Sequence, residues 1–209
     1  MLGIINYGAF VLSSILLNIT PGSDIIYVIT RSISGGRRVG VVSAAGICTG
    51  ILLHTLLASL GLSAILASSE TAFNVMKILG AAYLIVMGIR TIFQKSSILS
   101  TKGTVKQDSL SKTFREGVLT NALNPKVALF FLALLPQFVS PDNSFGPLPF
   151  MMLGFTFFTT SIIWCLFLAF VSSFASDLLM KNERVSRIAT KATGVIYIFL
   201  GLGVLLAKK

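Results

Sequence analysis

The chain has 209 residues, of which 54% are hydrophobic and only 11% are charged, and its formal net charge is +10. An average soluble domain contains about 25% charged residues, so this chain has too few charges to cover a globular surface in water. The composition excludes a soluble enzyme, a disordered chain and a nucleic-acid-binding domain. It predicts an all-α, polytopic membrane protein.

Six apolar segments are each long enough to form a membrane-spanning helix, which needs about 20 mostly apolar residues. They cover approximately residues 4–29, 39–67, 72–93, 114–138, 148–175 and 188–207. A topology of five crossings, in which one of these segments does not span, stays open. A stretch rich in Ser, Thr and Lys follows the third segment at residues 94–113, and it predicts a solvated linker.

Lysine and arginine residues lie mainly at one end of the predicted segments. The loops at that end hold thirteen of them: Arg31, Arg37, Arg38, Arg90, Lys95, Lys102, Lys106, Lys112, Arg115, Lys181, Arg184, Arg187 and Lys191. The other end holds three, Lys77, Lys208 and Lys209. Cytoplasmic loops carry the excess of basic residues in membrane proteins. We therefore expect the linker and the other basic loops in the cytoplasm, and both termini outside.

Two stretches of the chain share a pattern that indicates an internal repeat. Both read K-x-x-G-x-x-Y, at residues 77–83 and 191–197, and the first and fourth segments each place an Asn before a Pro. A three-span repeat enters the membrane from opposite sides in its two copies, as in many secondary transporters. We predict one transporter domain over residues 1–209, with inverted three-helix repeats at about 1–93 and 114–209. Chance similarity in a chain rich in Gly and aliphatic residues is the alternative.

Polar residues gather around the prolines that interrupt the first and fourth segments, Pro21 and Pro125. Proline removes a backbone donor, and unpaired backbone at membrane depth is tolerated where it is buried in protein or lines a wet cavity. Broken helices at corresponding positions of two halves indicate a transporter binding site. We predict a substrate or ion pathway lined by Asn18, Thr20, Pro21, Gly22, Asp24, Gly117, Asn121, Asn124, Pro125 and Lys126.

Asp24 and Lys126 are the two charged residues that we expect deepest in the bilayer. Each costs about 2.5–3.5 kcal/mol at the membrane centre, so each needs a compensating interaction. One explanation is a structural ion pair, or, for Lys126, a long side chain that reaches the interface. The other is a shared cavity for a zwitterionic amino acid. Its carboxylate would then lie at Lys126 and helix N-terminal amides, and its ammonium at Asp24 and the freed carbonyls.

A stripe of small and polar residues marks one face of the fourth segment. Gly117, Asn121 and Asn124 follow at i, i+4 and i+7, which places them on one side of a helix. We expect this face to contact another helix rather than lipid. The pattern Gly46-x-x-x-Gly50 in the second segment likewise predicts close helix packing.

The remaining polar or reactive residues have simpler interpretations. His54 is the single histidine. We expect it to be hydrogen-bonded, with a proton relay as the alternative because imidazole exchanges protons near physiological pH. Cys48 and Cys165 form no spacing typical of a metal site or a disulfide, and we expect buried packing residues. Arg115 and Glu116 are expected to be solvated at the cytoplasmic interface, and Trp164 to face lipid or the core.

The residues around both prolines resemble two signatures of the lysine exporter (LysE/RhtB) family of bacterial amino-acid exporters. Asn18-x-x-Pro21-Gly22-x-Asp24 is similar to the signature N-T-P-G-P-D, with Ser23 where the family usually has Pro. The second match runs from Phe114 through Gly117, Asn121, Asn124-Pro125-Lys126 and Phe130-Phe131 to Pro136-Gln137-Phe138. The resemblance implies export of an amino acid or a derivative across the inner membrane by proton antiport, with the motif residues along the pathway.

Other function classes stay open beside amino-acid export. A metal-ion exporter is one alternative, although divalent cations prefer several oxygen ligands and the two breaks offer one carboxylate, amides and a lysine. A transmembrane thiol carrier is another, although it needs paired cysteines in the broken segments, which contain none. No nucleophile–base pair indicates an enzyme, and we expect no cofactor and no bound metal. The expected partners are the small-molecule substrate, protons and membrane lipid, with a homo-oligomer left open.

Overall fold

The computed structural model describes residues 3–93 and 109–174, together with Lys191, Val195, Ile198, Phe199 and Leu202. Nearly all of the chain within the two long ranges is helical, and their β structure is limited to an isolated bridge between Ile4 and Val139. The predicted all-α class is therefore confirmed. The predicted sixth segment, most of the linker and the second copy of the K-x-x-G-x-x-Y pattern lie outside the described residues, apart from the isolated positions named above.

The described chain forms eight helical elements. In chain order they are α1 (Tyr7–Ile19), α2 (Ser23–Ser68), α3 (Glu70–Phe93), α4 (Leu110–Ala122), α5 (Pro125–Leu129), η1 (Phe130–Leu134), η2 (Leu135–Phe138) and α6 (Leu148–Phe174). The element η1 is a turn of π-helix and η2 a turn of 3₁₀-helix. These elements cover the first five predicted segments, with the two predicted breaks falling between α1 and α2 and between α4 and α5.

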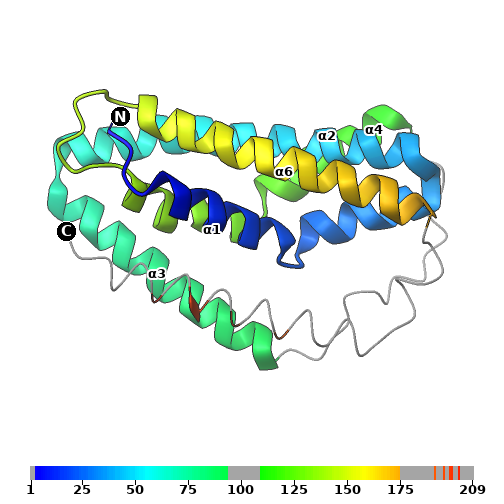
Figure 1. Cartoon of the computed structure of the whole chain (residues 1–209), viewed down its shortest axis with the longest axis horizontal. Coiled ribbons are helices and arrows are strands. Elements are labelled where there is room, and N and C mark those ends of the chain that lie inside the picture. Colours follow the sequence, from blue (N-terminus) through cyan, green and yellow to red (C-terminus); the bar gives the residue numbers. More distant parts are fainter. Residues whose placement is uncertain are drawn as a thin grey trace.

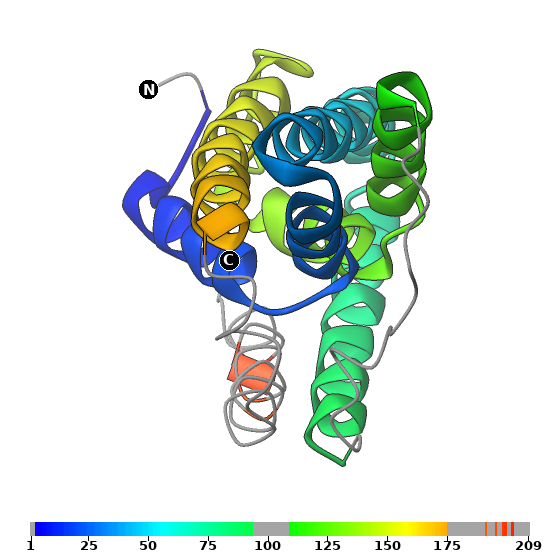
Figure 2. The same cartoon turned by 90° about the vertical axis from the view of Figure 1, so that its right-hand side faces the viewer.

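Helix α2 contains a sharp break at Gly36, where φ is 73° and ψ is −176°. A positive φ favours glycine because no Cβ clashes with the neighbouring carbonyl. The chain reverses direction at this point, so residues 23–35 (the first limb of α2) run back alongside residues 37–68 (the second limb) (Figures 1 and 2). A Cβ on Gly40 would overlap the Ser32 side chain, so the two limbs are packed closely. The reversal separates the first predicted segment from the second.

The helices form a bundle with α2 at its centre. Helix α6 packs along one side of α2 and α4 along the other, while α3 extends away from the bundle (Figures 1 and 2). Buried aromatic rings fix the broken segment against α1 and α6. The ring of Phe130 stacks on Phe157 at 4.5 Å, and Phe10 meets Phe138 edge-on at 5.2 Å. The segment after α4 is therefore held by packing even where its helical geometry is irregular.

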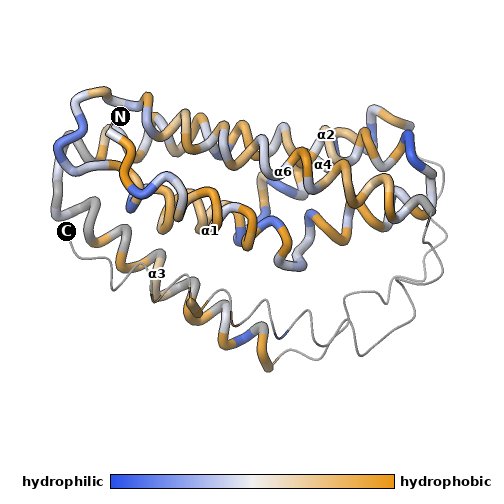
Figure 3. The backbone as a smooth tube through the Cα atoms, viewed as in Figure 1, coloured by the Kyte–Doolittle hydropathy of each residue, from blue (hydrophilic) through white to orange (hydrophobic). Residues whose placement is uncertain are grey.

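Basic residues gather at one end of this bundle. The reversal of α2, the start of α4 and the end of α6 lie together there (Figure 1). The Arg37 guanidinium lies 4.0 Å from the ring centre of Phe170, which joins the reversal of α2 to the last turns of α6. Hydrophilic residues lie at both ends of the bundle and also near its middle, around the break between α1 and α2, while hydrophobic residues dominate the lengths of α1 and α6 (Figure 3). The described basic residues of the α2 reversal and of the start of α4, which the sequence assigns to one side, thus share one end.

Several described helices have the length and composition of membrane spans. Residues Ser23–Ile65 and Leu148–Ser172 qualify on their own. The pair Leu110–Ala122 and Pro125–Phe138, bent by 44°, qualifies as a third if it is one broken span, and Tyr7–Ile19 is a shorter apolar helix. The chain is an all-α membrane protein, and the count of six crossings stays a prediction.

Candidate functional site

The first helix break brings two oppositely polarised helix ends together. Helix α1 ends at Ile19, the extended residue Gly22 precedes α2, and Pro21 lies between them. The last carbonyls of a helix carry partial negative charge and its first amides partial positive charge. This break therefore offers a site for a cation at the end of α1 and a site for an anion at the start of α2.

The Lys126 ammonium occupies the cation site. Lys126 belongs to α5, after the second break, and is only 7% exposed. Its Nζ donates hydrogen bonds to the carbonyl oxygens of Leu17 at 3.0 Å and Thr20 at 2.9 Å. A Cβ on Gly22 would lie 3.4 Å from the same Nζ, so the backbone of the first break lies directly against this ammonium. The two predicted helix breaks meet at Lys126.

Asp24 occupies the anion site, in the first turn of α2, and is 8% exposed. Its Oδ2 accepts a hydrogen bond from Asn121 Nδ2 at 2.9 Å, whereas Oδ1 has no hydrogen-bond partner. The Asn124 side chain lies beside the same carboxylate. Asn124 caps α5 by accepting the Lys126 backbone N–H at 3.0 Å, and its Nδ2 is unpartnered. The carboxylate thus keeps an open acceptor in a buried setting.

Asp24 and Lys126 line one small cavity of about 20 Å³, together with residues from α1, α2 and α6. Among the ion pairs between described residues, none joins these two side chains directly. A direct structural ion pair, one of the two explanations offered by the sequence, is therefore wrong. The carbonyls of Leu17 and Thr20 accept hydrogen bonds from Lys126, and the expected binding of a substrate ammonium at the freed carbonyls stays a prediction.

Other predicted pathway residues hold this arrangement in place. Asn18 connects α1 to α6: its Nδ2 donates to Thr160 Oγ1 at 3.0 Å, and its Oδ1 accepts from Ser161 Oγ at 2.7 Å. The Thr20 hydroxyl donates a hydrogen bond to the Leu16 carbonyl of the preceding helix, α1. Asn18 lines the cavity, whereas Thr20 contributes its backbone carbonyl. Pro125 begins α5 and Pro21 separates α1 from α2, as the sequence predicts for helix breaks.

The glycines of α2 and α4 allow these helices to approach closely. A Cβ on Gly117 would lie 3.1 Å from the Gly46 Cα, and a Cβ on Gly50 would lie 2.6 Å from the Asn121 Cβ. The prediction that this face of α4 packs on a helix, and that Gly46 and Gly50 serve close packing, is confirmed. Gly117 was also predicted to line the pathway, but it lies against the α2 backbone, at Ser43 and Ile47.

His54 and the two cysteines surround the same region. The His54 Nε2 is 3.1 Å from the Asn121 carbonyl oxygen, and its ring stacks on Phe131 at 5.7 Å, which confirms the hydrogen-bonded interpretation. Cys48 and Cys165 are both buried and free. They lie close to each other across the α2–α6 contact, and Cys165 lines the cavity. Their proximity joins two segments distant in sequence, so no local pattern could have predicted it.

A second pair of charges connects α2 to α4 closer to the basic end. The Arg31 guanidinium forms an ion pair with the Glu116 carboxylate, and their side chains are 12% and 34% exposed. Tyr27 OH donates to the Thr113 carbonyl at 2.7 Å beside this pair, and Arg31 lies over the Tyr27 ring. The expectation that Glu116 is simply solvated is therefore wrong, because the first limb of α2 brings a guanidinium to it.

Sequence comparisons agree with the motifs around the two breaks. The model of the family described as LysE type translocator matches residues 15–208. The chain belongs to the LysE type translocator family. It is therefore a membrane transporter of small molecules and not an enzyme. Within the described ranges, no group of three or more His, Cys, Asp or Glu side chains is arranged to hold a metal ion.

This LysE type translocator matches its relatives over nearly the full length of both chains. The uncharacterized membrane protein YrhP of Bacillus subtilis is 30% identical over 202 residues, which cover 93% of this chain and 95% of YrhP. The homoserine/homoserine lactone efflux protein of Salmonella typhimurium is 30% identical over 195 residues, 92% of each chain. A membrane protein of Vibrio cholerae is 31% identical over 200 residues, 95% of each chain. No solved structure matches.

Proposed function

We propose that this translocator exports an amino acid or an amino-acid derivative across the bacterial inner membrane in exchange for protons. The observation that carries the proposal is the pair Asp24 and Lys126, two buried opposite charges that line one cavity without contacting each other. A relative named for homoserine and homoserine lactone efflux, matched over 92% of this chain, supports the substrate class.

The chemistry of the cavity suits a zwitterion. An ammonium group has three donors, and Lys126 uses two of them on the carbonyls of Leu17 and Thr20. The third donor is available to a substrate carboxylate. The unpartnered Oδ1 of Asp24 is available to a substrate ammonium. Both charged ends of an amino acid would then meet a fixed group of opposite charge, and charge-assisted hydrogen bonds are roughly twice as strong as neutral ones.

The position of Asp24 supports proton exchange. Asp24 is buried and makes no direct contact with a cation among the described residues, and a buried carboxylate without such a contact is costly, so departure of the substrate ammonium favours the uptake of a proton at the open oxygen. Binding of the next substrate ammonium would displace that proton. Asp24 would therefore carry either substrate or a proton, which is the requirement for antiport.

The remaining sequence predictions complete the proposal. The end of the bundle that holds Arg37, Arg38, Lys112 and Arg115 would face the cytoplasm, in line with the excess of basic residues there. The termini would lie outside, and two inverted three-helix repeats would meet at the cavity.

An export assay with a panel of amino acids tests the proposal. Cells that express the protein are challenged singly with amino acids, homoserine, homoserine lactone and toxic analogues, and growth and accumulation in the medium are measured. We expect at least one compound to become less toxic and to accumulate outside. The variant Asp142→Asn, which removes one exposed carboxylate that does not line the cavity, should behave like the wild type. Failure to export any compound in the panel at normal protein levels would contradict the proposal.

The proximity of Cys48 and Cys165 is the one observation that favours a thiol carrier instead. A double change of both cysteines to Ser keeps their size and removes redox chemistry. The export proposal expects amino-acid efflux to persist in this variant. Loss of all function at normal protein levels would favour the thiol carrier.

A further inference from the structure

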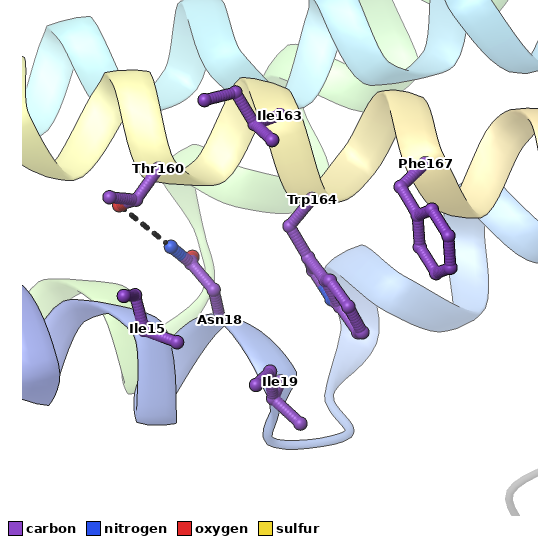
Figure 4. A pocket seen from close by; sticks show the side chains of 7 residues that line it. All are labelled: Ile15, Asn18, Ile19, Thr160, Ile163, Trp164 and Phe167. Atoms are coloured by element: carbon purple, nitrogen blue, oxygen red, sulfur yellow. Dashed lines mark hydrogen bonds between the residues drawn. The ribbon is translucent and has the colours of Figure 1, made fainter.

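A groove between α1 and α6 lies next to the polar cavity. It has a volume of about 450 Å³ and is lined by Ile15, Asn18, Ile19, Thr160, Ile163, Trp164 and Phe167 (Figure 4). Its two polar side chains, Asn18 and Thr160, are hydrogen-bonded to each other, so the groove offers an apolar surface to an occupant. Its volume lies within the range of about 300–1,000 Å³ that is usual for small-molecule sites.

The cavity at Asp24 and Lys126 cannot hold an amino acid as it stands. Its volume of about 20 Å³ is enough for roughly one water molecule. The groove provides the missing space, because two residues, Asn18 and Trp164, line both the cavity and the groove. These two side chains form the partition between the charged cavity and the apolar groove.

Trp164 is the part of this partition that no hydrogen bond holds in place. Asn18 is held by two hydrogen bonds to α6. The Trp164 ring stacks on Phe167 at 5.5 Å, but its buried Nε1 has no hydrogen-bond partner. The ring projects from α6 toward the end of α1 (Figure 4). An unpartnered buried N–H costs about 1–3 kcal/mol, and a ligand carboxylate or carbonyl at this position would remove that cost.

We propose that Trp164 separates the charged cavity from the α1–α6 groove, and that the groove receives the apolar side chain of the transported amino acid. This inference rests on the proposed export function. The charged end of the substrate lies at Asp24 and Lys126, the Trp164 N–H donates to its carboxylate, and the side chain extends along Ile15 and Ile163. The substrate class is therefore an amino acid or derivative with a sizeable apolar side chain, such as leucine or phenylalanine.

Trp164 is the single tryptophan of the chain, so its fluorescence reports on this partition directly. The purified protein in nanodiscs is titrated with leucine, phenylalanine, homoserine and glycine while tryptophan emission is followed. Leucine and phenylalanine should shift or quench the emission at concentrations about tenfold lower than glycine, because a buried methylene discriminates by about tenfold or more. Emission that is unchanged by every compound that the protein exports would overturn the inference.

Substitutions in the groove give an independent test by transport. Ile15→Trp fills the groove from α1, and Leu12→Trp places the same side chain on α1 at an exposed position outside the groove. Ile15→Trp should reduce leucine and phenylalanine efflux about tenfold relative to homoserine, whereas Leu12→Trp should leave the ratio unchanged. Equal effects on all substrates would overturn the inference. An absence of amino-acid export from the wild type would instead defeat the proposed function itself.

Lipid is the competing occupant of the groove. Nanodiscs with brominated acyl chains quench a tryptophan that contacts lipid. We expect saturating leucine to relieve this quenching, because the leucine side chain displaces any acyl chain from the groove. Quenching that persists unchanged at saturating leucine would assign the groove to lipid and overturn the inference.

Discussion

Two pairs of opposite charges lie between α2 and the segment that contains α4 and α5, and they are built in different ways. Arg31 and Glu116 touch each other near the basic end of the bundle. Asp24 and Lys126 lie deeper, each on a separate helix end, and share a cavity without touching. In both pairs, one member comes from the first limb of α2 and the other from the segment after the linker.

The comparison separates a structural charge pair from one that can bind a third group. Arg31 and Glu116 neutralise each other, so their contact joins two helices. Asp24 and Lys126 are stabilised by the N-terminal end of α2 and the C-terminal carbonyls of α1. Oδ1 of Asp24 has no hydrogen-bond partner, and Lys126 uses two of its three donors. Charges that are held apart in this way can be bridged by a zwitterion.

Exchanging the charges within each pair should give the largest contrast. The double change Asp24→Lys with Lys126→Asp places a cation at the start of α2 and an anion against the Leu17 and Thr20 carbonyls. Both helix ends then repel the charge, and we expect transport to be lost and the yield of folded protein to fall steeply.

The matched exchange, Arg31→Glu with Glu116→Arg, keeps a direct ion pair and should preserve most of the folded protein and of the efflux. Size-exclusion chromatography in detergent and efflux assays measure both outcomes. If both exchanges left folding and efflux equally intact, the distinction between a structural pair and a substrate-binding pair would be contradicted.

Lys126→Met should have the next largest effect. The change removes the donor to two buried carbonyls, and each unsatisfied group costs about 1–3 kcal/mol, although loss of a buried charge offsets part of this. We expect efflux to be lost and the thermal unfolding temperature to fall. Lys112→Met, at a side chain that is 57% exposed, should change either quantity little, since exposed pairs contribute about 0–1 kcal/mol. Normal efflux by Lys126→Met would show that Lys126 does not take part in substrate binding.

Ser23→Pro should have the smallest effect. Ser23 is the first residue of α2, where proline is favoured, and Gly22 before it is extended, with φ −162° and ψ −177°, as a residue before proline prefers. We expect unchanged efflux and stability that is equal or higher by about 0.4–1 kcal/mol. Ser34→Pro, within the first limb, should destabilise by about 3 kcal/mol. Reduced efflux or reduced stability of Ser23→Pro would show that the first break does not tolerate the proline that the family signature has at this position.

Much of the fold could be predicted from the sequence because its causes are local. Runs of apolar residues define the helices, and Pro21 and Pro125 interrupt them where the structure has breaks. The reversal at Gly36 was expected only as a loop, since a positive φ leaves no trace in hydropathy. Pro136 is a local signal for the irregular turn η2, whereas the burial of Phe130 and Phe131 of η1 in one core with Phe10 and Phe157 is not encoded by any local pattern.

The members of the site could be predicted better than their contacts. The cost of burying a charge in lipid identified Asp24 and Lys126, but nothing local indicates that Lys126 would donate to α1 carbonyls rather than contact Asp24. Glu116 looked solvated because its partner, Arg31, is 85 residues away in the chain. The sequence did not indicate a polar role for Trp164. Its N–H is buried without a hydrogen-bond partner, and this can be recognised only in the folded structure.

The claim that Asp24 binds substrate and proton in turn can be tested most directly by proton-driven exchange in proteoliposomes. Wild type, Asp24→Asn and the control Asp142→Asn are reconstituted at equal density, and uptake of a labelled substrate is measured with and without a pH gradient. Asparagine at position 24 keeps an acceptor for Asn121 and removes a buried charge, so we predict normal insertion and no uptake under either condition, with Asp142→Asn active. Gradient-driven uptake by Asp24→Asn at the wild-type rate would contradict the account.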